Sequence, residues 1–338
     1  MYKLNKLLEQ NYNICTALHV FDHTIKPIIL YASEVWAVEL ASTLPAEGTS
    51  WVKALEKNPI SQIELKFYRR LLQVKRHTPI LGIRGELGRH PLILTAILNS
   101  VKYLHTIRAK PSKKLVKEAL AENHSLHSKN KKAWLSQLES ITEKMHININ
   151  NIQPEKLKTS IKKIERNLII KYESLWHDRI TDPNSLTGQT SGNKLRTYQT
   201  FKQNFALEKY LLNTDNINHR RAISKIRLSS HPLNIESKRG TITDPNNRFC
   251  PFCQTPLVEN EEHFLMSCSL YFKERENLLN IINQNTNVQN LTNNEKFIWL
   301  MSNEDKKICK ALGKFIADSL SARTTKINEK KENNKPDD

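Results

Sequence analysis

Apolar residues recur every three or four positions along much of the chain, which is the spacing of one face of an α-helix. Two segments, residues 60–75 and 154–180, show this pattern most clearly. Their apolar positions are Ile60, Ile63, Phe67, Leu71 and Val74 in the first and Leu157, Ile161, Ile164, Leu168 and Leu175 in the second. The apolar–polar alternation that is typical of β-strands is scarce. The sequence therefore predicts a mainly α-helical protein.

Shorter stretches with the same spacing predict further helices near 3–26, 91–104, 115–120, 198–205, 217–228, 269–284, 294–301 and 305–320. Residues 41–50 indicate a loop, and residues 181–193, rich in Pro, Asn, Ser, Thr and Gly, indicate a linker. The expected order is a helical region at 1–110, a helical connector at 111–193, a helical subdomain at 194–320 and a polar tail at 321–338. Because the tail mixes charges and has few apolar residues, we expect it to be disordered.

The chain is strongly basic, with 52 Lys and Arg against 34 Asp and Glu in 338 residues and a net charge of +18. Such a surplus favours a polyanionic partner, most often nucleic acid, although it also serves solubility alone. Basic residues concentrate in two stretches, on the helix at 60–75 with its continuation and just before a cysteine-rich segment. The candidate nucleic-acid contacts are Lys66, Arg69, Arg70, Lys75, Arg76, Arg220, Arg221, Lys225, Arg227 and Arg248. The alternative for each stretch is a solvated helix face.

A metal-ligand pattern stands near the C-terminal end, where Cys250, Cys253, His263 and Cys268 form C-x2-C-x9-H-x4-C. Three thiols and one imidazole suit tetrahedral Zn²⁺, and four protein ligands leave no open position for catalysis. We therefore expect a structural zinc site, which we call a knuckle, at residues 249–268. Acidic residues Glu259, Glu261 and Glu262 lie between its ligands, so we expect this loop to repel phosphate.

The remaining cysteines and the hydropathy pattern bear on the compartment. The chain has five cysteines, an odd number, which favours a reducing environment in the nucleus or cytoplasm over a disulfide scaffold. Cys15 and Cys309 are expected to be small buried apolar residues. No stretch reaches the roughly 18 apolar residues of a membrane span, and the first residues do not resemble a signal peptide.

Three segments in order resemble the region downstream of the polymerase palm in non-LTR (LINE-type) retrotransposon reverse transcriptases. KPIILYASEVWAVEL (26–40) is similar to the family's YGSEVWG-type segment, and residues 63–92 are similar to its helix with a GELGR-P stretch. Residues 220–236, followed by 250–275, resemble the region that ends in its Cys-Cys-His-Cys knuckle. The resemblance implies that 1–110 is thumb-like, and that the chain grips RNA or DNA beside a catalytic polymerase domain when it is part of a longer protein.

The chain also departs from the family. Its only adjacent aspartates are Asp337 and Asp338, so the Tyr/Phe-x-Asp-Asp motif that would hold two Mg²⁺ ions is missing. The family's endonuclease domain is also missing, and position 32 is Ala where the family usually has Gly. We therefore expect no polymerase activity from this chain alone and predict a nucleic-acid-binding fragment. The alternative hypothesis is a zinc-stabilised helical module that binds another protein.

Overall fold

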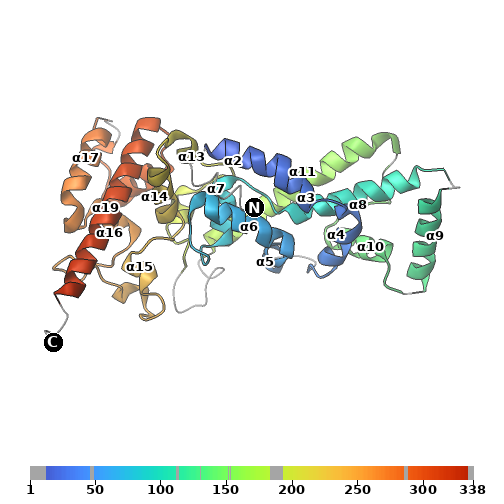
Figure 1. Ribbon diagram of the computed structural model, residues 1–338, viewed down its shortest axis with the longest axis horizontal. Coiled ribbons are helices and arrows are strands. Elements are labelled where there is room, and N and C mark those ends of the chain that lie inside the picture. The colour runs from blue at the N-terminus through green and yellow to red at the C-terminus, as the bar shows by residue number, and fades with distance from the viewer. Residues whose placement is uncertain are drawn as a thin grey trace. The chain divides into compact units, whose positions relative to one another are not determined.

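The computed structural model describes residues 13–45, 49–111, 114–129, 131–150, 152, 154–182, 193–284 and 288–333. The described residues are mainly helical, which confirms the predicted fold class (Figure 1). They contain no β-strand, only isolated bridges that join Leu87 to Leu207 and Phe249 to Val258. None of the described helices combines the length and the apolar character that a bilayer crossing requires.

Contacts divide the chain into two compact units that interleave along the sequence. Unit 1 comprises the described parts of 1–17, 68–88 and 180–338, and unit 2 comprises those of 18–67 and 89–179. The sequence suggested four consecutive ranges, whereas these units interleave, because periodicity shows where helices lie but not which of them pack together. Helices α2 (Ile14–Val20) and α6 (Pro59–Leu72) carry the chain from one unit to the other.

Unit 2 is a bundle in which α4 packs against α8 and α10, and α9 packs against both α8 and α10. Small residues on α4 allow its close approach to α8, where the Asn99 side-chain amide donates to the Ser33 hydroxyl at 2.9 Å. The elements are η1 (Phe21–Ile25), α3 (Lys26–Ile29), α4 (Ser33–Ser42), α5 (Thr49–Lys57), α8 (Leu92–Arg108), α9 (Leu115–Ser128), α10 (Trp134–Lys144), η2 (Pro154–Lys156) and α11 (Leu157–Thr181).

In unit 1 the long helix α19 packs against α13, α14, α17 and α18. The elements are α7 (Ile80–Leu87), α12 (Tyr198–Phe201), α13 (Tyr210–Asn213), α14 (Ile217–Arg227), α15 (Asn234–Ser237), η3 (Pro245–Asn247), α16 (Glu261–Met266), η4 (Ser269–Tyr271), α17 (Phe272–Ile282), α18 (Asn293–Ser302) and α19 (Lys306–Glu332). The helix predicted at 198–205 is shorter than expected. Most of the predicted linker, residues 183–192, lies outside the described residues.

The tail predicted to be disordered from residue 321 is instead the second half of α19 as far as Glu332. Asp305 begins this helix, with its carboxylate accepting hydrogen bonds from the backbone N–H groups of Lys307 and Ile308. Arg323, on the late part of the helix, is buried and paired with Glu259. A polar helix can therefore be held by internal ion pairs that composition does not reveal. Residues 334–338 lie outside the described part.

Five described residues adopt the left-handed conformation that favours glycine, namely Ala32, Gln73, Gly88, His146 and Ser229. Gly88 closes α7 with φ 59°, and an added Cβ there would lie 2.7 Å from the backbone nitrogen of Leu207. Ala32, just before α4, has φ 52° without being glycine. Left-handed geometry costs an alanine roughly 1 kcal/mol, so this position carries a small strain.

Candidate metal centre

The segment before α16 folds back on itself and brings the first two cysteines to the helix. The backbone N–H of Cys250 donates to the carbonyl of Leu257 at 2.7 Å, and that of Glu259 donates to the carbonyl of Arg248 at 3.0 Å. Asn260 then begins α16, because its side-chain oxygen accepts the backbone N–H of His263 at 2.8 Å. This cap places His263 in the first turn of the helix.

The four predicted ligands converge on one point. The Sγ atom of Cys268 lies 3.8 Å from that of Cys250 and 3.9 Å from that of Cys253, and Cys253 Sγ lies 3.4 Å from His263 Nε2. All four donor atoms lie within 4.8 Å of one another. Cys250, His263 and Cys268 are buried, and Cys253 is half-buried. This group could hold a metal ion, and it supplies four donors from the protein.

The thiols interact strongly with one another. The hydrogen bond with Cys268 lowers the pKa of the Cys250 thiol to about 3. The same bond, together with burial, raises the pKa of Cys268. The cluster therefore carries a thiolate readily, and the thiolate is the form of cysteine that binds metals.

Ser267 orients the histidine ligand. Its hydroxyl lies 3.1 Å from His263 Nδ1 and 3.5 Å from the His263 carbonyl oxygen. If the hydroxyl donates to that carbonyl, it accepts the N–H at Nδ1, which leaves the lone pair on Nε2 facing the cysteines. A hydrogen bond of this kind to the outer ring nitrogen fixes the tautomer and the ring of metal-binding histidines.

Removal of this hydroxyl should weaken metal binding without abolishing it. We expect a Ser267→Ala variant to bind Zn²⁺ about 10-fold more weakly, because partners of this kind typically contribute 10- to 100-fold in affinity. A competition titration against a chelator measures the change. The matched control is Ser302→Ala, at the exposed end of α18, which should leave the affinity for Zn²⁺ unchanged. Equal affinities in the two variants would show that Ser267 does not contribute to metal binding.

Arginines stabilise the segment around the four predicted ligands through hydrogen bonds and an ion pair. Arg275 is buried and donates to the carbonyls of Leu265 and Cys268, each at 2.7 Å. Arg323 binds both carboxylate oxygens of Glu259 at 2.8 Å. The ring of Phe252 faces Arg323 and Lys330, at 5.9 and 5.3 Å.

A second ion-pair group holds the start of α16. Arg196 donates to both carboxylate oxygens of Glu261, at 2.6 and 2.8 Å, and His231 Nε2 lies 2.8 Å from the same group. Burial alone would raise the pKa of Glu261, but the charge of Arg196 and the bond with His231 outweigh it and lower it to about 2. Glu259 and Glu261 are both buried. The expectation of an acidic loop exposed to a phosphate is therefore wrong for these two residues.

The predicted basic contacts fall into three groups. Four are exposed, namely Lys66, Arg70, Lys75 and Arg76; three are half-buried, namely Arg69, Arg221 and Lys225; and three are buried, namely Arg220, Arg227 and Arg248. Arg248 donates to the backbone carbonyls of Ile235, Ile242 and Thr243. Arg227 is paired with buried Glu86. Arg227 and Arg248 are therefore occupied inside the protein.

Four basic residues of unit 1 form a cluster, which we call the cationic cluster: Lys75, Lys194, Arg221 and Lys225. Burial lowers the pKa of Lys225, and the charges of Arg221 and Lys75 lower it further. Burial also lowers the pKa of Lys194; Glu236 opposes this change, whereas Lys75 adds to it. Like charges therefore meet here, and Glu236 offsets part of the charge of Lys194. The structure thus brings together Lys75, Arg221 and Lys225, which belong to separate basic stretches of the sequence.

These features define the class of protein as a helical protein with a group of three cysteines and one histidine that could hold a metal ion. Comparison with known proteins finds no matching family model, no similar curated protein and no similar solved structure.

Sequence reasoning missed Ser267, Arg196 and Arg323, which support the cluster from outside. A serine four residues after His263 on a short helix was a usable signal, because residues at that spacing are neighbours. Arg323 is separated from Glu259 by 64 residues and Arg196 from Glu261 by 65, and no local pattern marks such pairs. Cys309 is buried as expected, whereas Cys15 is exposed, against the prediction.

Proposed function

We propose that this chain is a zinc-stabilised, nucleic-acid-binding region of a non-LTR retrotransposon reverse transcriptase, and that it acts beside a polymerase domain without being an enzyme itself. Three lines of support carry the proposal: the geometry of the metal cluster, the positive charges gathered in the cationic cluster, and the sequence resemblance with two backbone features that accompany it.

Zinc fits the metal cluster by donor type and by spacing. Around a tetrahedral ion with Zn–S bonds of about 2.3 Å, neighbouring sulfur atoms are separated by about 3.8 Å. The two close sulfur–sulfur distances here are 3.8 and 3.9 Å. Three thiolates and one imidazole are donors that zinc prefers, and with four protein ligands the ion has a structural role.

The cationic cluster is the single observation that carries the proposal of nucleic-acid binding. Lys75, Lys194, Arg221 and Lys225 repel one another in the free protein, and a phosphate backbone would relieve this repulsion. Two of the three acids in the loop between the metal ligands, Glu259 and Glu261, are neutralised internally by arginines. They therefore neither repel phosphate nor offer an acidic surface to the protein partner that the alternative hypothesis requires.

The resemblance has structural support at two positions. Ala32 occupies the place where the family usually has Gly, and its φ of 52° is one that glycine adopts without strain. Gly88, in the GELGR stretch, closes a helix with φ 59° beside a backbone that leaves no room for a side chain. Both residues thus occupy positions whose backbone conformation favours glycine.

Binding to RNA or DNA should depend steeply on salt. For duplex DNA, the logarithm of the affinity should fall against the logarithm of salt concentration with a slope of about −0.9 for each neutralised phosphate. In a Lys75→Glu/Lys225→Glu variant we expect weaker binding. The slope should also become less steep by about 2, roughly one unit for each lysine. Fluorescence anisotropy across a salt series, with labelled RNA and DNA separately, measures both quantities.

The control for this experiment is Lys314→Glu/Lys331→Glu, which makes the same charge change at exposed positions of α19. It should bind nearly as tightly as the unmodified chain. Affinity that is equal in the two double variants would show that the cationic cluster is not the binding surface. A flat salt dependence of the unmodified chain would contradict nucleic-acid binding altogether.

A further inference from the structure

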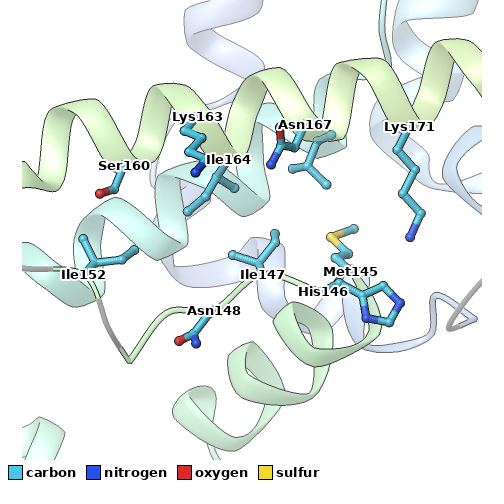
Figure 2. Close-up of a pocket in the computed structure, with 11 residues that line it drawn as sticks. Met145, His146, Ile147, Asn148, Ile152, Ser160, Lys163, Ile164, Asn167 and Lys171 are labelled. Carbon is cyan, nitrogen blue, oxygen red and sulfur yellow. The ribbon is translucent and has the colours of Figure 1, made fainter.

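Unit 2 contains a groove of about 500 Å³ between α11 and the extended segment at 145–152 (Figure 2). Its apolar wall includes Ile147, Ile164 and Leu168. The groove is separate from the metal cluster and from the cationic cluster, which belong to unit 1.

One face of α11 presents polar side chains to this groove. Ser160, Lys163, Asn167 and Lys171 follow one another at intervals of three, four and four residues, which places them on one side of the helix. In Figure 2, Lys163, Asn167 and Lys171 extend from α11 toward the facing segment. Lys163 and Asn167 are exposed and Ser160 is half-buried. No side chain of the described residues forms a hydrogen bond with Ser160 or Asn167. These two side chains can therefore form hydrogen bonds with a ligand in the groove.

The charge of the groove selects an anion. Among the described residues that line it, Lys163 and Lys171 are basic and none is Asp or Glu. The Lys171 ammonium group lies over the ring of Trp51, 5.7 Å from its centroid, which holds it at the groove. The suitable ligand combines negative charge with a flat, partly apolar body that has hydrogen-bonding edges.

A second row of cations runs along α11 on another side of the helix from the groove. Lys158, Lys162 and Arg166 are exposed and recur every four residues, a rise of about 6 Å each. No described acidic residue forms an ion pair with any of the three. Evenly spaced cations of this kind suit an extended chain of negative charges better than an isolated small anion.

We propose that this groove binds one unstacked nucleotide of a single-stranded nucleic acid. The base lies against Ile164 and Leu168 and forms hydrogen bonds with Ser160 and Asn167, while its phosphate lies near Lys163 and Lys171. Proteins commonly recognise single strands in this way, by placing splayed bases in pockets and cations along the backbone. The inference rests on the proposed function and assigns it a second site, in unit 2.

The test uses the full chain, a labelled single-stranded RNA oligonucleotide and a labelled duplex of the same length. Ser160→Phe fills the groove without changing charge, and Thr159→Phe makes the same change at an exposed neighbouring position outside the groove. We expect Ser160→Phe to weaken single-strand binding by at least about fivefold, the lower limit for one stacked base. Duplex binding should remain within about twofold, and Thr159→Phe should change neither affinity.

A second pair of variants tests the phosphate contact. Lys163→Gln/Lys171→Gln should lower the salt slope for the single strand by about 1. The control Lys102→Gln removes a charge from an exposed position of α8 and should leave the slope nearly unchanged. If Ser160→Phe alters the circular dichroism spectrum, Ser160→Ala/Asn167→Ala replaces it, with Thr159→Ala as its control.

Equal single-strand affinity of the groove variants and their controls would overturn the inference. If the Lys75→Glu/Lys225→Glu variant still weakens binding in that case, the proposed function stands without this site. Failure of the unmodified chain to bind any nucleic acid at low salt would remove both proposals. Competition by polyglutamate as effective as that by unlabelled RNA would overturn the inference in favour of a general acidic ligand.

Discussion

A Cys253→Ser variant should lose the bound zinc ion and much of the stability of the segment around residues 248–275. Structural zinc contributes roughly 10–16 kcal/mol in small zinc-finger peptides, where no other core exists. Here Arg323 and Arg275 also brace the segment, so we expect a smaller loss, of more than about 4 kcal/mol. Thermal denaturation, together with limited proteolysis of the segment, measures the loss.

Cys15→Ser is the matched control, because Cys15 is exposed and lies outside the metal cluster. It should melt like the unmodified chain. A zinc chelator should lower the melting temperature of the unmodified chain and of Cys15→Ser, but should change Cys253→Ser little. If Cys253→Ser and Cys15→Ser are equally stable, the cluster does not hold a structural ion.

The second large effect is expected at Glu86, which lies inside unit 1. Both of its carboxylate oxygens accept hydrogen bonds from Arg227, at 2.9 to 3.1 Å, and one also accepts the Tyr210 hydroxyl at 2.6 Å. Arg227 also donates to Glu208 at 2.6 Å, and its guanidinium lies 4.6 Å from the Phe201 ring centroid. Glu86 and Arg227 are almost fully buried, so neither charge has water to replace a lost partner.

Glu86→Ala should therefore destabilise the protein by about 3 kcal/mol, the lower end of the usual cost of removing one partner of a buried ion pair, because Arg227 keeps its second partner, Glu208. Chemical denaturation measures this loss. Glu276→Ala, at an exposed position of α17, should cost less than about 0.5 kcal/mol. In the double variant Glu86→Ala/Arg227→Met, part of the stability should return, because no buried charge remains without a partner. A double variant less stable than Glu86→Ala would contradict this explanation.

Sequence periodicity located the long helices well. The apolar stripe at 60–75 corresponds to α6, and that at 154–180 corresponds to α11. A stripe is a local property, set by neighbours three and four residues away, so it can be recognised without tertiary information. The spacing of Cys250, Cys253, His263 and Cys268 predicted their convergence for the same reason. The two cysteines of the first pair lie in one turn, and the short helix α16 links His263 to Cys268.

The sequence could not separate structural arginines from surface arginines. Arg70 and Arg227 both lie on helices within basic stretches, yet Arg70 is exposed and Arg227 is buried against Glu86, separated from it by 141 residues. The same limitation explains the expectation that the acidic loop repels phosphate. The arginines that pair with Glu259 and Glu261 are distant in sequence, so the sequence did not indicate that these two charges are neutralised. The helical end of α19 depends on such a pair as well, through Arg323.

The most direct test of this account is the metal content of the purified full chain, measured by inductively coupled plasma mass spectrometry. We predict one zinc ion per chain. Replacement of any one of the four residues Cys250, Cys253, His263 and Cys268 should abolish its binding. A protein that is well folded, contains no metal and takes up none when zinc is added would contradict the account.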